Sequence, residues 1–154
     1  MNVLFAAAEV APLIKTGGLA DVAGALPAAL RRAGHDVRVV MPYFRELRER
    51  GIPVEGPIAA SFLTVGERQE ELRVWRLAGS ETPVYLLDIP AAFERTAIYG
   101  EGDDDRRFIL FARGVLAHFP RVVAVHVRVR KLKPPIPERI AAVGVDLRLA
   151  RTDL

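Results

Sequence analysis

The sequence predicts an α/β fold built around a parallel sheet, and three observations lead to this prediction. Residues 2–8 form a short apolar run of the kind that is buried on both faces of a parallel sheet. Residues 19–33 repeat apolar side chains at helical spacing, and residues 37–41 form a second β-rich apolar run. Because a crossover of this length joins parallel strands, the first 41 residues predict a βαβ unit.

The loop before this helix contains Pro12 and the pair Gly17-Gly18, which break regular structure and let the backbone approach a ligand closely. Gly34 fits a C-terminal cap at the other end of the helix. Pro27 interrupts the helical pattern. It either starts a second helical segment or kinks one continuous helix, and the pattern is compatible with both.

Residues 58–90 follow a different sequence pattern. Three strand-like runs, 58–65, 72–77 and 84–88, are separated by short polar breaks, which favour antiparallel hairpins over further βαβ crossovers. Residues 103–118 predict a helix, because their apolar side chains recur at helical spacing and three aspartates lie in or before the first turn, where the helix dipole favours negative charge.

Composition and charge limit the class of protein. With 154 residues, of which 51% are hydrophobic, the chain is expected to form one globular domain. It has no cysteine, which excludes disulfides, a thiolate nucleophile and sulfur-ligated zinc. Residues 1–118 hold 14 basic and 16 acidic side chains, whereas residues 119–154 hold eight and three, so the basic character belongs to the tail. The first apolar run ends at Glu9, well short of a membrane span, which predicts a soluble cytoplasmic protein.

The segment from Lys15 to Gly18 is the strongest candidate for a binding site. A glycine pair between a buried strand and a helix presents backbone N–H groups and the positive helix end to an anion, and Lys15 adds a full charge. A phosphate-bearing ligand suits this arrangement, although the segment is neither a Walker A loop nor a dinucleotide-binding turn. A surface lysine beside a glycine turn is the alternative interpretation, since glycine-rich loops are common in this fold class.

Two blocks of sequence carry a resemblance to a known family. The first is Lys-Thr-Gly-Gly-Leu-Ala-Asp-Val-Ala-Gly-Ala-Leu-Pro-Ala-Ala-Leu from Lys15, continuing through residues 34–39 and 41–43. The second consists of residues 87–90, 93–95, 99–100, 103–108 and 111–113, in matching order and approximate spacing. Together they resemble the N-terminal signature of bacterial glycogen synthases and plant starch synthases. The resemblance covers residues 1–119 and leaves 120–154 as a divergent basic tail.

This resemblance implies a fold and an activity. The fold would be the Rossmann-like N-terminal lobe of a two-lobed, GT-B type glycosyltransferase, here incomplete. The activity would be retaining transfer of glucose from ADP-glucose to the non-reducing end of an α-1,4-glucan such as glycogen or starch, with no metal and no other cofactor. The alternative is an inactive truncated fragment, or a module that binds glucan or nucleotide sugar without the donor-binding lobe.

The resemblance also assigns the loop residues. Lys15 would pair with the ADP-glucose phosphate, and the Gly17 and Gly18 backbone would support the diphosphate or the departing ADP. A cation and N–H donors suit a leaving diphosphate, because negative charge builds there as the glycosidic bond breaks. No catalytic residue is assigned, since the family's mechanism is drawn as same-face displacement assisted by the leaving phosphate.

Three further residues are candidates for the substrate site, each with an alternative. Asp21 either lines the sugar side of the loop or caps a helix that begins at Val22. Tyr99 either stacks on a sugar or packs at a strand-to-helix junction. Asp103 either binds sugar hydroxyls, as its place in the family pattern implies, or marks a solvated helix start. Asp104 stands where the family has Asn.

The tail departs from the family pattern. Family members continue with a strand ending in His-Asp-Trp-His, whereas here residues 122–126 resemble that strand only faintly and residues 127–130 read Val-Arg-Val-Arg. A frameshift or premature stop would produce such an Arg, Val and Pro-rich segment. The rival is a basic arm for nucleic acid or a membrane surface. Since the tail has neither interleaved aromatics nor helical amphipathicity, we expect neither partner.

Overall fold

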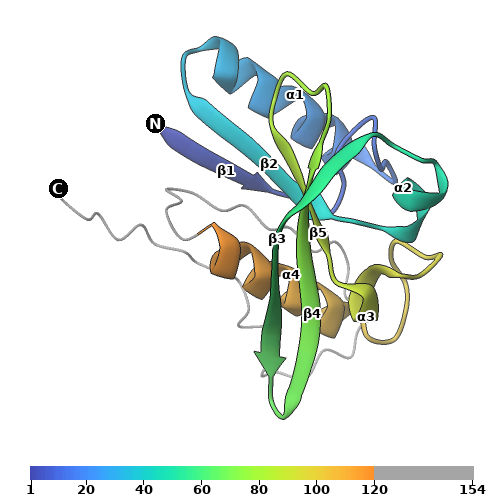
Figure 1. The fold of residues 1–154 in the computed structure, drawn as a ribbon. Coiled ribbons are helices and arrows are strands. Elements are labelled where there is room, and N and C mark those ends of the chain that lie inside the picture. The colour runs from blue at the N-terminus through green and yellow to red at the C-terminus, as the bar shows by residue number, and fades with distance from the viewer. Residues whose placement is uncertain (120–154) are drawn as a thin grey trace, which may run out of the picture.

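A five-stranded mixed sheet organises residues 1–119, the part of the chain that the computed structural model describes. The strands lie in the order β1-β2-β5-β4-β3 (Figure 1). Their bounds are β1 Asn2–Ala6, β2 Asp36–Pro42, β3 Val54–Val65, β4 Arg68–Leu77 and β5 Val84–Asp88. The first three strands of this order run parallel, and β4 and β3 pair antiparallel.

The predicted βαβ unit and hairpins are confirmed. Val3 on β1 pairs with Val37 on β2 in a parallel ladder, and the two are joined through helix α1 (Gly18–Arg32). Gly66, at φ +61°, lies in the tight turn that brings β4 back against β3. The sheet is therefore mixed and not wholly parallel, because a two-residue connection can only join antiparallel neighbours.

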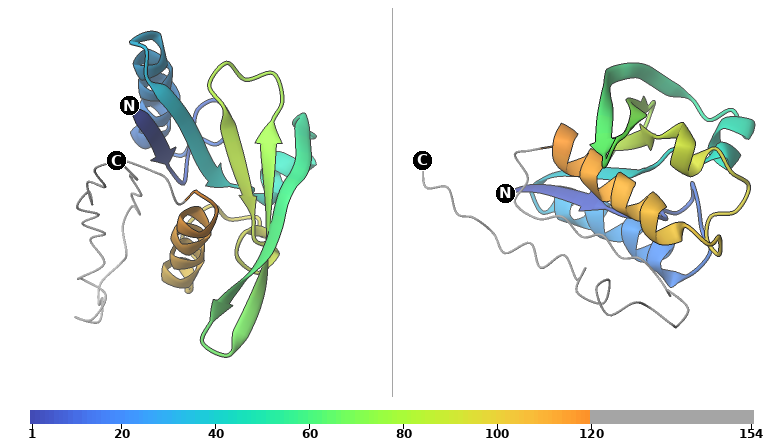
Figure 2. Two further views of the ribbon diagram at one scale, coloured as in Figure 1. Left: turned by 60° about the vertical axis from the view of Figure 1, so that its left-hand side comes forward. Right: turned by 90° about the horizontal axis from the view of Figure 1, so that it is seen from below.

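The two long helices cover opposite faces of the parallel strands, as Figure 2 shows. Helix α1 is continuous through Pro27, which is buried, so the open question about this proline is answered in favour of one helix. Gly34 adopts φ +88° just beyond its end, as expected for a C-terminal cap. Helix α4 (Asp104–His118) confirms the second predicted helix. No helix within residues 1–119 has the length and apolar character needed to cross a membrane.

Aromatic side chains from separate elements meet between the sheet and α4. Phe93 lies in the short helix α3 (Pro90–Phe93), and its ring centroid is 5.3 Å from that of Phe44 and 5.9 Å from that of Phe108. Gly114 lets α4 approach the strands, because a Cβ there would lie 3.0 Å from a methyl group of Leu87. Another short helix, α2 (Arg45–Glu49), follows β2.

A hydrogen bond of 2.8 Å between Ser61 Oγ and His118 Nε2 joins β3 to the last turn of α4. Burial lowers the pKa of His118 below its usual 6.5. The unfolded chain therefore takes up this proton at higher pH than the folded protein, and the stability that neutral His118 contributes above about pH 6.5 is lost as the pH falls below it.

We therefore expect the free energy of unfolding to fall between pH 7.5 and 5.5, and to fall less in His118→Gln. Denaturant unfolding at the two pH values measures this difference. His35→Gln, which removes a histidine elsewhere, is the control and should keep the full drop. If the free energy of unfolding falls equally in His118→Gln and in the wild-type protein, this role for His118 is refuted.

Candidate functional site

Residues 7–17, here called the Lys15 loop, lie at the edge of the sheet where ligands bind most often in open α/β folds. Strands β1, β2 and β5 run parallel, so their carboxyl ends meet at one edge. The loop at residues 7–17 follows β1 there and leads into the N-terminus of α1 (Figure 1). The predicted anion site is thus placed at the carboxyl edge of the sheet.

Glu9 is the buried centre of this loop, with no exposed side-chain surface. Its Oε2 accepts hydrogen bonds from the backbone N–H of Thr16 at 2.7 Å and of Gly17 at 3.1 Å. Its Oε1 accepts one from the Tyr99 hydroxyl at 3.0 Å. Two of the predicted site residues, Gly17 and Tyr99, are therefore brought together by a carboxylate that was not assigned a role from sequence.

Lys15 and Asp21 form an ion pair above the first turn of α1. The distance from Lys15 Nζ to Asp21 Oδ1 is 2.8 Å, and each side chain is more than half exposed. The helix begins at Gly18, with Gly17 as its N-cap residue. The interpretation of Asp21 as the cap of a helix starting at Val22 is therefore wrong, because Asp21 already lies inside the first turn.

The N-terminus of α1 has backbone donors that find no acceptor within the helix. The N–H of Gly17 is bonded to Glu9, and that of Ala20 to the Gly17 carbonyl at 3.2 Å. Helical geometry gives the N–H groups of Gly18 and Leu19 no acceptor within the helix. A Cβ at Gly18 would meet nothing within 4 Å. Two N–H groups, the positive helix end and the Lys15 ammonium together suit an anion.

Gly24 holds α1 against the same loop. A Cβ at this position would lie 2.6 Å from the carbonyl oxygen of Ala11, which is too close for any side chain. The N–H of Ala11 also donates to the Ala20 carbonyl at 3.0 Å. The loop and the helix therefore fit together only because residue 24 has no side chain.

We expect Gly24→Ala to lower the free energy of unfolding by about 1 to 3 kcal/mol, because the helix or the loop must shift to make room. Thermal and denaturant unfolding measure the change. Gly102→Ala is the matched control, since a Cβ there meets nothing within 4 Å and its φ is not positive. A Gly24→Ala protein as stable as the control would contradict this close fit.

Asp103 is held by Arg95. The Arg95 guanidinium donates to Asp103 Oδ1 at 2.7 Å and to Oδ2 at 2.8 Å, and it also pairs with Glu101. The hydrogen bonds from Arg95 lower the pKa of Asp103. Asp103 is the N-cap residue of α4, but its side chain makes no capping bond. Instead Asp104 accepts the Gly100 N–H at 2.7 Å. The role of Asp103 towards sugar stays a prediction.

Tyr99 packs as well as bonding to Glu9. Its ring centroid lies 5.6 Å from that of Phe108 at an interplanar angle of 33°. The residue is only partly buried. These contacts show the packing role; stacking on a sugar stays a prediction.

Arg107 is the second buried charge that was given no role from sequence. Its side chain is fully buried. The guanidinium donates to the Ala92 carbonyl at 2.7 Å, to the Ala97 carbonyl at 3.2 Å and to Asp104 Oδ1 at 2.7 Å. It thereby joins α4 to α3 and to the segment that carries Tyr99.

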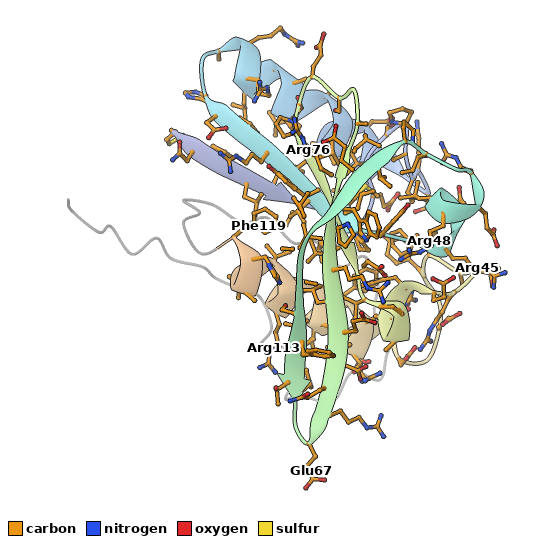
Figure 3. All side chains as sticks on the ribbon, in the orientation of Figure 1. Arg45, Arg48, Glu67, Arg76, Arg113 and Phe119 are labelled. Atoms are coloured by element: carbon orange, nitrogen blue, oxygen red, sulfur yellow. The ribbon has the colours of Figure 1, made fainter. Side chains whose placement is uncertain are left out.

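Asp88 ends β5 at the same carboxyl edge and is almost fully buried. Arg48 of α2, labelled in Figure 3, donates to Asp88 Oδ1, and Arg73 lies 3.7 Å from Oδ2. The Arg48 guanidinium carbon also lies 4.1 Å from the ring centroid of Tyr43, whose pKa is raised by burial. Among residues 1–119, no group of three or more His, Asp or Glu side chains is arranged to hold a metal ion.

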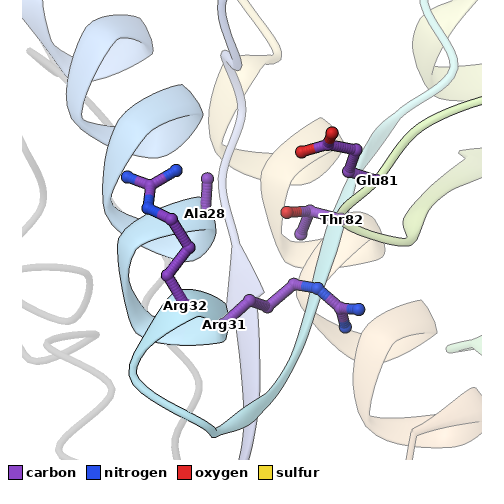
Figure 4. A pocket seen from close by; sticks show the side chains of 5 residues that line it. All are labelled: Ala28, Arg31, Arg32, Glu81 and Thr82. Atoms are coloured by element: carbon purple, nitrogen blue, oxygen red, sulfur yellow. The ribbon is translucent and has the colours of Figure 1, made fainter.

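A separate hollow of about 230 Å³ lies at the other edge of the sheet (Figure 4). It is lined by Ala28, Arg31, Arg32, Glu81 and Thr82. Arg31 and Arg32 are in the last turn of α1, whereas the Lys15 loop precedes its first turn. The hollow is therefore at the opposite end of α1 from the predicted site residues.

Comparisons with known proteins agree on one family. The model of the starch synthase catalytic domain matches residues 2–132, so the match extends beyond residue 119. A glycogen synthase of Syntrophotalea carbinolica is 42% identical over 127 residues, which cover 79% of this chain and 26% of that protein. A glycogen synthase of Bacillus subtilis is 40% identical over 116 residues, which cover 75% of this chain and 24% of that protein.

A solved structure is similar as well. The catalytic domain of starch synthase IV from Arabidopsis thaliana, bound to ADP and acarbose, superposes with a TM-score of 0.71 at 28% identity. The similarity covers 82% of this chain and 27% of that one. The chain thus spans about a quarter of the length of the curated relatives and of the solved structure that it matches.

Proposed function

Because the chain belongs to the family of starch synthase catalytic domains, we propose that it serves in the transfer of glucose from ADP-glucose to an α-1,4-glucan. The transfer would take place in the cytoplasm, with retention, at the non-reducing end of glycogen or starch. The relatives named glycogen synthase and a solved neighbour that binds ADP and acarbose support this proposal.

The observation that carries the proposal is the Lys15 ammonium beside the open N-terminus of α1. The Lys15 side chain is 56% exposed, so it can reach a ligand, and Asp21 keeps it over the first helical turn. A diphosphate would receive this charge together with the N–H groups of Gly18 and Leu19. These donors stabilise negative charge where it grows as the bond from glucose to ADP breaks.

In this proposal residues 1–119 form one wall of the cleft in a GT-B type enzyme. Asp21, Tyr99 and Asp103 would lie on the sugar side. The loop needs no nucleophilic side chain for this role, since it binds the leaving group and does not attack glucose. The basic tail at residues 120–154 is not given a part in the reaction.

Incubation of the purified chain with ADP-[14C]glucose and glycogen tests the proposal. Radiolabel in the precipitated polymer, absent when the chain is omitted, is the expected result. The second candidate is a module that binds donor or glucan without transferring glucose. Saturable ADP binding with no labelled polymer would support that module. If the chain neither binds ADP nor labels the polymer, both candidate functions are refuted.

A further inference from the structure

We propose that Glu9 is a positioning residue for the diphosphate site: it fixes the Lys15 loop from inside and directs an anion to the Gly18 and Leu19 amides. The inference rests on the proposed function for the identity of the anion. The internal contacts of Glu9 can be tested with no ligand present, so the two can fail separately.

The first step is the placement of Glu9. Strand β1 ends at Ala6, and the three alanines at 6–8 are buried, so the chain reaches Glu9 along a fixed path through the core. A carboxylate with no exposed surface is costly to bury unless its oxygens accept hydrogen bonds. Thr16, Gly17 and Tyr99 supply three, which makes this an anchored group.

The second step is what these bonds do to the loop. By accepting the N–H groups of Thr16 and Gly17, Glu9 turns both amides inward and closes the chain from residue 9 to residue 17. Gly17 is then held as the N-cap residue, in an extended conformation at φ −165°. The start of α1 is thereby fixed, and with it the turn that carries Asp21 beneath Lys15.

The third step concerns the ligand. The amides of Thr16 and Gly17 already have an anionic partner, so an incoming phosphate cannot use them without displacing Glu9. The next two amides along the chain, those of Gly18 and Leu19, have no intrahelical acceptor. Glu9 therefore decides which N–H groups an anion meets, and it also ties Tyr99 to the same loop.

The test compares Glu9→Gln with Glu9→Ala in the full chain. Glutamine can accept both amide bonds through its oxygen and donate to Tyr99 through its nitrogen, whereas alanine can do neither. In the ligand-free protein, we expect hydrogen exchange at the Thr16 and Gly17 amides to quicken about tenfold or more in Glu9→Ala. In Glu9→Gln the rates should stay within about threefold of the original.

Titration with ADP provides the second readout. Glu9→Ala should bind ADP about tenfold more weakly, and Glu9→Gln should retain most of the affinity. Leu63→Ala, a buried position on β3 away from the loop, controls for lost stability and should leave the ADP affinity unchanged.

Unchanged exchange at Thr16 and Gly17 in Glu9→Ala would overturn the inference. The inference would also be overturned if Leu63→Ala, at the same stability as Glu9→Ala, lost as much ADP affinity as Glu9→Ala does. If the original chain binds no ADP, the proposed function fails, while the exchange rates still decide whether Glu9 sets the loop.

Discussion

Arg107→Ala should lower the free energy of unfolding by about 3 to 5 kcal/mol. The guanidinium is fully buried and donates to two backbone carbonyls, of Ala92 and Ala97, as well as to Asp104. Its removal leaves these acceptors without their donor and opens a cavity beside Phe93 and Phe108, whose ring centroids lie 5.5 and 5.8 Å from the guanidinium carbon.

Denaturant unfolding, followed by circular dichroism, measures this loss. Arg113→Ala is the matched control, because it removes the same side chain from an exposed position of the same helix (Figure 3). We expect the control to change stability by no more than about 0.5 kcal/mol. An Arg107→Ala protein that is as stable as Arg113→Ala would show that the buried network does not hold α4 to α3.

Lys15→Gln should weaken ADP binding by about 10- to 100-fold, since a charge-assisted contact to phosphate is lost. Calorimetry or fluorescence titration measures the affinity. The side chain is more than half exposed, so the fold should keep its stability and the loss should be confined to binding.

The control for this variant must remove an equal charge elsewhere. Arg32→Gln does so at the hollow beyond the other end of α1. It should bind ADP as the original chain does, at matched ionic strength. Equal weakening in the two variants would mean that net charge, and not the Lys15 loop, governs binding.

Much of the fold could be predicted from local pattern. Short apolar runs indicated β1 and β2, and helical spacing of apolar residues indicated α1 and α4. The short polar breaks around Gly66 and Gly79 indicated the antiparallel strands. The helices α2 and α3 were missed because five and four residues are too few to show a helical period. The prediction started β4 at residue 72, whereas the strand begins at Arg68. The first residues of β4 are polar and extend the hairpin beyond the core, so they lack the apolar pattern of a buried strand.

The candidate site was predicted less completely. Lys15, Gly17 and Gly18 stood out by residue type, and the structure places them together at the carboxyl edge of the sheet. Glu9 and Arg107 did not stand out, because a charge in a sequence does not reveal whether it will be buried. A charged residue directly after an apolar strand is the one signal that could have identified Glu9, since it has to be paired if the chain stays inside. The misplacement of Asp21 came from starting α1 four residues too late.

The most direct test of the central claim is an ADP titration of the isotopically labelled chain, monitored at each backbone amide. We expect the Gly18 and Leu19 signals to shift saturably with ADP in the original chain, and to shift only weakly in Lys15→Gln. Signals of Arg31 and Arg32 should stay in place. Saturable shifts at Arg31 and Arg32 with none at Gly18 and Leu19, or no saturable shift anywhere, would contradict the claim that the Lys15 loop receives the diphosphate.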